Sequence, residues 1–254
     1  MPQTPEALRE HVESFLRSLP FMRELGTLDA PMRHSLGGKR VRPVLCLAAG
    51  EAVGGTVAHV LPAAAAVELV HSFSLVHDDL PALDNDTLRR GVPTVWAAYG
   101  EATAVLAGDA LLAEAFRLVL DYESSAVARQ LVEATILMIG GQQQDLEGGH
   151  DLAELHRLKT GALFVASVMC GVQAAGLPEA RQAPWRAFAD ELGLLFQVVD
   201  DILDSDGYVS EIGEDGARRL ADEAGERARE RLHAIDADTT VIRTIVDGLV
   251  ARTS

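Results

Sequence analysis

HSFSLVHDDLPALDNDTLRR, spanning His71–Arg90, places four carboxylates within nine residues and follows them with two arginines. Like charges packed this closely repel one another, which costs stability unless cations lie among them. The stretch therefore predicts a site that holds cations. The acidic members are Asp78, Asp79, Asp84 and Asp86, and the basic members are Arg89 and Arg90.

A second acidic cluster, FQVVDDILD, carries Asp200, Asp201 and Asp204 on an otherwise apolar segment. Asp200 and Asp204 are four residues apart, so they share one face of a helix. Buried or half-buried carboxylates need partners. Two groups of hard oxygen ligands, one with arginines beside it, indicate Mg²⁺ holding a polyphosphate between two helices.

The rest of the chain is typical of an all-α protein. Hydrophobic residues make up 48% of it and aromatic residues only 5%, and Ala and Leu dominate, which favours helices. Pro81 predicts that the helix before it ends near Asp79. No long Pro, Gly or Ser linker divides the sequence, so we expect one domain, residues 1–254, of about ten helices. Helices are expected at 5–19, 44–53, 60–79, 95–120, 126–147, 152–175, 184–204 and from 216 onwards in two segments.

Composition also excludes several classes of protein. A net charge of −16 argues against nucleic acid as a partner, because a phosphate backbone needs a basic face. The N-terminal residues lack the pattern of a signal peptide, and the uncharged run Gly161–Leu177 predicts a buried helix and no membrane span. Cys46 and Cys170 carry no disulfide or metal pattern and are expected to be reduced thiols. We expect a cytoplasmic protein.

Three shorter motifs are weaker on their own. GGKRVRP places Gly37 and Gly38 before three cations, and glycines let a backbone approach a ligand closely, although a solvated helix start remains an alternative. Gln142 and Asp145 stand three apart on one helix face. Lys159 and Thr160 lie inside a helical pattern, where a surface position is the simpler interpretation. The cations of the first motif are Lys39, Arg40 and Arg42.

Taken together, these motifs suggest a site that binds a diphosphate group at the metals and an apolar chain in a pocket below them, because the helices between the acidic clusters are rich in Ala, Val, Leu and Phe. That description fits a prenyl diphosphate. HDDLPALDNDTLRRG, GGKRVRP, KTG at 159–161 and FQVVDDILD also resemble, in order and spacing, the motifs of trans-isoprenyl diphosphate synthases. The chain is most similar to the bacterial-type farnesyl and geranylgeranyl diphosphate synthases, whose first motif carries two extra residues, here from LPAL.

The resemblance implies an isoprenoid synthase-type bundle around a central cavity, a homodimer, three Mg²⁺ ions, and isopentenyl diphosphate and an allylic diphosphate as substrates. It implies metal binding by Asp78 and Asp84 with support from Asp79, and by Asp200 with help from Asp201 and Asp204; Asp145 would lie near the metals. For substrate binding it implies Arg89, Lys159, Thr160 and Gln197 on the allylic side, Lys39, Arg42, His71 and Arg90 on the isopentenyl side, and Gln142 near the metals. The implied catalytic set is Asp78, Asp79, Asp84, Arg89, Lys159, Asp200 and Asp201.

The implied reaction is loss of diphosphate, attack by the isopentenyl double bond and loss of a proton. Phe73 and Ser74 lie a turn before Asp78 and would set product length. The family tendency of an aromatic at the fifth position before the motif favours farnesyl diphosphate, with geranylgeranyl or geranyl diphosphate as alternatives. Alternatives of other kinds are a terpene cyclase, which would lack DDILD, and a non-catalytic subunit of a heteromeric synthase, which would lose one acidic motif.

One departure from the family pattern follows Asp204. The segment SDGYVSEIGEDG contains no lysine, whereas the family usually has a longer, lysine-containing loop there. Losing one charge-assisted contact to diphosphate would weaken binding by about 1.5–3 kcal/mol if no other group replaced it.

Overall fold

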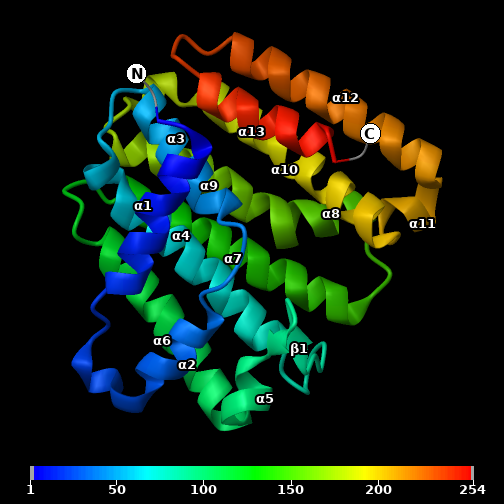
Figure 1. Cartoon of the computed structure of the whole chain (residues 1–254). Helices are drawn as coiled ribbons and strands as arrows, with labels where there is room; N and C mark the ends of the chain where they lie inside the picture. Colours follow the sequence, from blue (N-terminus) through cyan, green and yellow to red (C-terminus); the bar gives the residue numbers. More distant parts are fainter. Residues whose placement is uncertain (1–2, 253–254) are drawn as a thin grey trace.

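Thirteen α-helices account for most of residues 3–252, the part of the chain that this computed structural model describes (Figure 1). The all-α prediction is confirmed. The elements in chain order are α1 (Pro5–Ser18), η1 (Arg23–Leu28), α2 (Asp29–Ser35), α3 (Val41–Ala52), α4 (Val57–Asp78), β1 (Leu88–Arg89), β2 (Val92–Pro93), α5 (Val95–Tyr99), α6 (Glu101–Val119), α7 (Ala126–Glu147), α8 (Leu152–His156), η2 (Arg157–Gly161), α9 (Ala162–Ala174), η3 (Glu179–Arg181), α10 (Ala183–Asp204), α11 (Tyr208–Ile212), α12 (Glu214–His233) and α13 (Thr240–Val250).

The expected count of about ten helices was too low, because several helices are too short to show a periodic pattern. The single helix expected at 95–120 is two, α5 and α6, broken at Gly100, whose φ of +87° is left-handed. The helix expected at 152–175 is α8 and α9 joined through η2, a π-helical turn. Helix α4 begins three residues before the expected start, because the Thr56 hydroxyl accepts the N–H of His59 at 3.3 Å and caps it.

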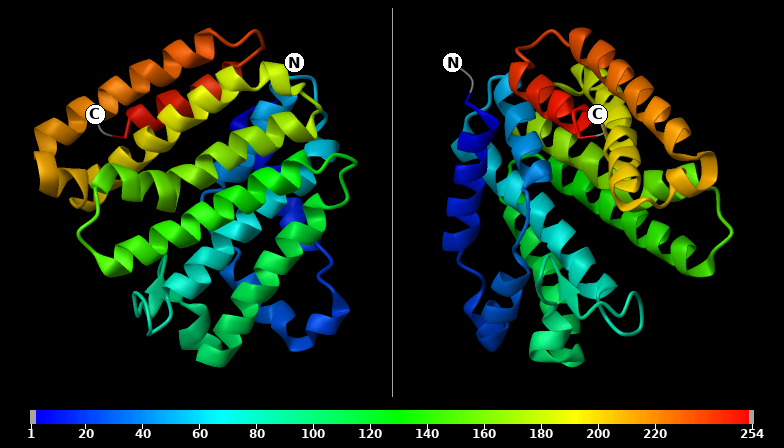
Figure 2. Two further views of the ribbon diagram at one scale, coloured as in Figure 1. Left: turned by 180° about the vertical axis from the view of Figure 1, so that it is seen from behind. Right: turned by 45° about the vertical axis from the view of Figure 1, so that its right-hand side comes forward.

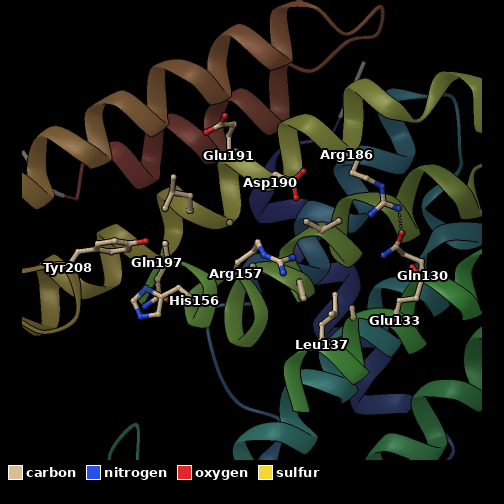
Figure 3. Close-up of a pocket in the computed structure, with 17 residues that line it drawn as sticks. Gln130, Glu133, Leu137, His156, Arg157, Arg186, Asp190, Glu191, Gln197 and Tyr208 are labelled. Carbon is tan, nitrogen blue, oxygen red and sulfur yellow. Dashed lines mark hydrogen bonds between the residues drawn. The ribbon is translucent and has the colours of Figure 1, made fainter. Parts of the chain in front are cut away.

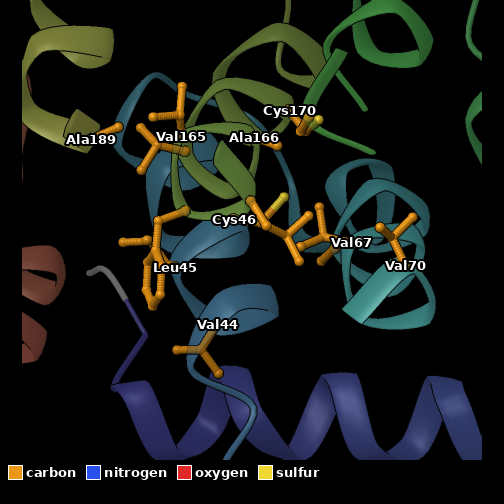
Figure 4. Close-up of a cluster of buried hydrophobic side chains, with 14 of the residues drawn as sticks. Val44, Leu45, Cys46, Val67, Val70, Val165, Ala166, Cys170 and Ala189 are labelled. Atoms are coloured by element: carbon orange, nitrogen blue, oxygen red, sulfur yellow. The ribbon is translucent and has the colours of Figure 1, made fainter. Parts of the chain in front are cut away.

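The core lies where α3, α4, α9 and α10 meet. Figure 4 shows Cys46 of α3, Val67 of α4 and Cys170 of α9 in one cluster of buried side chains. Helices α3 and α9 cross closely: a Cβ at Gly171 would lie 2.1 Å from the carbonyl oxygen of Cys46. Both thiols are free and buried, and burial raises the pKa of Cys170 to about 12. Helices α12 and α13 pack outside α10 and cover it (Figure 2).

One described helix, α4, is long and apolar enough to cross a membrane by length and composition. Most of its apolar window is buried inside the protein, against α3, α6 and α9. Gly161–Leu177, expected to be buried, lies largely within α9, where nearly every side chain is inaccessible. The most apolar helices are therefore core elements of the bundle.

Candidate active site

A cavity of about 320 Å³ opens beside the C-terminal end of α4. The C-terminal ends of α4, α7 and α10 lie on the same side of the bundle (Figure 1). Predicted site residues and apolar side chains line the cavity together. The predicted members are Arg42, His71, Phe73, Ser74, Asp78, Gln142, Lys159 and Thr160; the apolar ones, which the sequence did not single out, include Leu83, Met138, Leu146 and Leu163.

The first acidic motif folds back on itself at the mouth of this cavity. Helix α4 ends at Asp78, and the backbone N–H of Asp84 donates to the carbonyl oxygen of Asp78 at 2.9 Å. This hydrogen bond closes a bend that returns the backbone of Asp84 to the end of α4. Burial raises the pKa of Asp78 to about 6; Lys159 opposes this shift, and the negative charge of Asp84 adds to it. The carboxylates thus carry uncompensated charge that a cation would stabilise.

Asp79 forms an ion pair with Arg89. Its Oδ1 lies 2.6 Å from Nη2 of Arg89, and its side chain is only 5% exposed. Arg89 also contacts Asp86 at 3.3 Å. The arginine is held by a β-hairpin, β1–β2, whose turn residues Arg90 and Gly91 both have positive φ, as the tightest hairpin turns require. Asp79 therefore fixes the direction of Arg89, which was predicted to bind diphosphate.

Lys159 is brought into the cavity by the π-helical turn η2. A Cβ at Gly141 of α7 would lie 2.6 Å from the backbone nitrogen of Lys159, so the two segments approach one another closely there. The Lys159 ammonium lies 2.6 Å from Oδ2 of Asp145. Asp145 and Lys159 were predicted in separate roles, and the structure pairs them. A single extra residue in a helical turn often occurs at functional sites.

Arg42 forms no ion pair with a carboxylate of residues 3–252. Its guanidinium lies over the rings of Phe164 and Phe196, 4.5 and 5.5 Å from their centroids, and its buried Nε has no hydrogen-bond acceptor. Burial lowers its pKa to about 10. Gln142, on the same cavity wall, also has a buried Oε1 without a donor. Unsatisfied buried polar groups are costly in a native protein, so these two indicate a ligand that completes them.

His71 shows how strongly positive this end of the cavity is. Burial lowers its pKa well below the usual range, and Arg42, Arg90, Arg89 and Arg40 lower it further. The imidazole is therefore neutral at pH 7 and can bind an anion only as a hydrogen-bond donor. A cluster of arginines that depresses a histidine in this way is suited to a multiply charged anion.

Arg40 has a different role from its neighbours in GGKRVRP. It is 4% exposed, and its Nη1 lies 2.6 Å from Oε1 of the buried Glu68 while its Nε donates to Glu13 at 2.9 Å. Arg40 also donates to the carbonyl oxygen of Gly37, as does Arg90. These bonds shape the turn at Gly37 and Gly38 (the glycine turn). A Cβ at Gly38 would clash with the Arg90 guanidinium.

The second acidic motif presents two aspartates outward and one inward. Asp200 and Asp204 are exposed on α10, whereas Asp201 is buried. The chain shields the Asp200 carboxylate partly from water, and this raises its pKa; Asp204 raises it further, while Arg42 and Lys39 oppose the shift. Asp200 is thus within the electrostatic reach of the cations predicted to hold isopentenyl diphosphate.

Gln197 was expected on the same side of the site as Lys159 and Thr160, but it does not line this cavity. It faces a second cavity of about 520 Å³ between α7, α8 and α10, and donates to Oδ1 of Asp201 at 2.7 Å (Figure 3). Arg186 and Gln130 are hydrogen-bonded to each other on the opposite wall, at 2.6 Å. None of the aspartates predicted to bind metal lines this second cavity.

No group of three or more His, Cys, Asp or Glu side chains within residues 3–252 lies close enough to hold a metal ion alone. Mg²⁺ in nucleotide and diphosphate sites characteristically takes one or two carboxylates and completes its shell with phosphate oxygens and water. Asp78 and Asp84 on one side and Asp200 and Asp204 on the other offer carboxylates of this kind. The donor set fits Mg²⁺ bound together with a phosphorylated ligand.

An all-α bundle with acidic motifs at the ends of two helices, and a cavity lined by both charged and apolar side chains beside the first of them, fits the class of isoprenoid synthase folds. A family model for polyprenyl synthetase matches residues 26–222. The chain belongs to the polyprenyl synthetase family.

Relatives and solved structures agree with this assignment. The chain is 45% identical over 191 residues to a geranylgeranyl diphosphate synthase of Cyanophora paradoxa, covering 68% of this chain and 64% of that protein. It is 41% identical over 204 residues to a farnesyl diphosphate synthase of Geobacillus stearothermophilus, covering 73% and 69%. A solved FPP/GFPP synthase of Zymomonas mobilis matches with a TM-score of 0.85 and 31% identity, covering 96% of each chain.

Proposed function

We propose that this protein is a short-chain prenyl diphosphate synthase that condenses isopentenyl diphosphate with an allylic diphosphate in a Mg²⁺-dependent reaction. The observation that carries the proposal is Arg42, which lines the same cavity as Asp78, forms no ion pair with a carboxylate in the described part of the chain, and has a buried Nε without an acceptor. An arginine without a carboxylate partner and a carboxylate of raised pKa that line one cavity fit a metal-bound diphosphate, because the metal and the diphosphate supply the two missing charges. The relatives described above are named as synthases of this kind.

The side chains would divide the work between two diphosphates. Arg42 and the neutral His71 line the cavity, with Arg90 close enough to lower the pKa of His71 and Lys39 close enough to lower that of Asp200; these four would hold isopentenyl diphosphate. Lys159 and Arg89 lie nearest the Asp78 group and would hold the allylic diphosphate. Mg²⁺ at the acidic motifs would supply positive charge that stabilises diphosphate as it leaves. The apolar lining, including Met138 and Leu163, would keep water from an allylic cation.

The direct test is incubation of the purified protein with isopentenyl diphosphate, Mg²⁺ and each allylic primer in turn, with products sized after dephosphorylation. We expect a prenyl alcohol from at least one primer and none when EDTA is added. Absence of product with every primer would overturn the proposal and favour a non-catalytic partner subunit. Against that alternative, the chain keeps both acidic motifs and the cationic cavity.

We propose farnesyl diphosphate as the main product, with geranylgeranyl diphosphate the alternative that the Cyanophora relative's name supports. Phe73 and Ser74 both line the cavity below Asp78, and the Phe73 ring packs edge-on against His77 with centroids 5.0 Å apart. A large ring at this depth would stop a chain that grows downward from the metals.

Phe73→Ala should therefore lengthen the product distribution by one or more five-carbon units, because removing the ring deepens the cavity. Reversed-phase or thin-layer separation of the dephosphorylated products would measure the shift. Phe116→Ala, which removes the same ring from α6 outside the cavity lining, is the matched control and should leave the profile as it is. An unchanged profile for Phe73→Ala would remove this residue from length control.

We also propose that two copies of the chain associate through α6 and α7. Both helices expose apolar side chains, including Leu106, Ile136 and Ile139, which are 54%, 63% and 50% exposed. Exposed apolar side chains on two helices in contact would form a protein interface when a second copy covers them. The homodimer implied by the family resemblance would cover them.

Ile136→Glu should shift the protein from dimer to monomer, because it would bury an unpaired charge at the centre of this surface. Sedimentation equilibrium over a range of protein concentrations would measure the change, and we expect the dimer dissociation constant to rise at least about 100-fold. Ile212→Glu makes the same substitution at an exposed position on α11 and should leave the association unaltered. A wild-type protein that is monomeric at all concentrations would contradict the proposal.

A further inference from the structure

We propose that Asp201 is a positioning residue that anchors α11 to the end of α10, and that it is not a magnesium ligand. This inference rests on the proposed function, because it assigns different tasks to the two adjacent aspartates of the second acidic motif. Asp200 faces the cations of the active site, whereas Asp201 faces the segment that follows the motif.

Both carboxylate oxygens of Asp201 are already engaged. Oδ1 accepts from Nε2 of Gln197 at 2.7 Å, and Oδ2 accepts from the backbone N–H of Tyr208 at 2.9 Å. Tyr208 is the first residue of α11, so Asp201 satisfies one of the N–H groups that a helix leaves unpaired at its start. The Asp201 side chain is 8% exposed, too little to share a coordination shell with water and diphosphate oxygens.

The connector Ser205–Gly207 is wrapped around this carboxylate. The N–H of Asp206 donates to the backbone carbonyl oxygen of Asp201 at 3.0 Å. Gly207 has a φ of +49°, and a Cβ on it would lie 2.1 Å from Oδ2 of Asp201. Only glycine leaves room for the carboxylate at this point, so the connector and Asp201 are matched to each other.

Asp201 also meets the element that carries Lys159. His156 ends α8, immediately before the π-helical turn, and its Nδ1 lies 3.8 Å from Oδ2 of Asp201. The His156 ring packs edge-on against the Tyr208 ring, with centroids 5.2 Å apart, and Figure 3 shows the two side chains facing each other. Asp201 thus lies at the junction of α10, α11 and the end of α8.

This arrangement offsets the missing lysine-containing loop. A long loop can be ordered by a lysine that binds diphosphate, but the three-residue connector here is ordered by Asp201 without any ligand. Ordering in the free protein removes that conformational cost from substrate binding. The anchor would thereby hold Asp200 and Asp204 on the side of Lys39 and Arg42.

The test compares Asp201→Asn, Asp201→Ala and Asp200→Asn by thermal unfolding, first without metal and then with Mg²⁺ and inorganic diphosphate. Asparagine can still accept the Tyr208 N–H through its Oδ1 and can donate to the Gln197 amide once that amide turns over, whereas alanine can do neither. Without metal, Asp201→Ala should lower Tm by about 2–4 °C, while Asp201→Asn and Asp200→Asn should stay within about 1 °C of the wild type. With Mg²⁺ and diphosphate, Asp201→Asn should keep the wild-type stabilisation and Asp200→Asn should need at least about tenfold more Mg²⁺.

Two results would overturn the inference. One is an Asp201→Asn variant that needs as much extra Mg²⁺ as Asp200→Asn, which would make Asp201 a ligand. The other is an Asp201→Ala variant with the Tm of the wild type, which would show that it anchors nothing. If Asp201→Ala does not fold, the Mg²⁺ requirement of the Asp201→Asn variant still decides between the two roles. Thermal unfolding does not require turnover. A failure of the proposed activity would appear separately, as absence of product from the wild-type protein in the primer assay.

Discussion

Asp78→Asn should reduce turnover by about 10²–10³-fold, because it removes the carboxylate at the mouth of the cavity on which Mg²⁺ and the departing diphosphate would depend. The same substitution should stabilise the metal-free protein at pH 7.5. The pKa of Asp78 is about 6 in the folded protein, above its usual value, so at pH 7.5 the residue is ionised at a cost to folding. Each unit of pKa is about 1.36 kcal/mol, which bounds the gain at about 3 kcal/mol.

The pH dependence of the stability follows from the upward direction of this pKa shift. A raised carboxyl pKa destabilises the fold above the folded-state value, and the cost disappears as pH falls through about 6. The stability advantage of Asp78→Asn should therefore be largest at pH 7.5 and vanish near pH 4 in urea unfolding without metal. Asp222→Asn, the same change at an exposed position on α12, should alter neither turnover nor stability. Near-normal turnover of Asp78→Asn would remove this residue from the chemistry.

Arg40→Ala should lower the free energy of unfolding by about 3–5 kcal/mol, because it leaves Glu68 buried without its cation. Glu68 is 2% exposed, and its Oε1 lies 2.6 Å from the guanidinium of Arg40. The glycine turn should loosen as well, since Arg40 also binds the carbonyl oxygens of Gly37 and Leu36. Denaturant unfolding followed by circular dichroism would measure the loss.

Two companion variants separate the charge effect from lost packing. Arg23→Ala removes an arginine that is 95% exposed and should change stability by no more than about 0.5 kcal/mol. Arg40→Met combined with Glu68→Leu replaces the buried pair with apolar groups of similar size and should recover most of the stability. Equal losses for Arg40→Ala and Arg23→Ala would refute a structural role for Arg40.

The separation of Arg40 from Arg42 has a functional consequence. The two arginines are two residues apart, yet Arg40 pairs with the buried Glu68 and the half-buried Glu13, whereas Arg42 forms no ion pair with a carboxylate among the described residues. The paired arginine builds the turn, and the unpaired one is free for an anion. The same division recurs in Asp200 and Asp201, where one carboxylate faces the active-site cations and its neighbour anchors a helix.

Much of this protein could be predicted from its sequence because the relevant signals are local. Apolar periodicity predicted the long helices. Pro81 predicted that α4 ends near Asp79, and the helix ends one residue earlier, at Asp78. The bend that returns Asp84 to Asp78 follows from a proline and a six-residue separation. Motif order and spacing also led to the family that the comparisons establish.

Tertiary structure alone decided what each charged residue of a motif faces. A helical period says that Asp200 and Asp201 point in different directions, but which direction meets Arg42 and which meets Tyr208 depends on how α3, α10 and α11 pack. The same holds for Gln197, which packing turns toward the second cavity. The physical reason is that spacing along a chain determines relative orientation within one helix, whereas a side chain's partner, burial and pKa come from segments far away in the sequence.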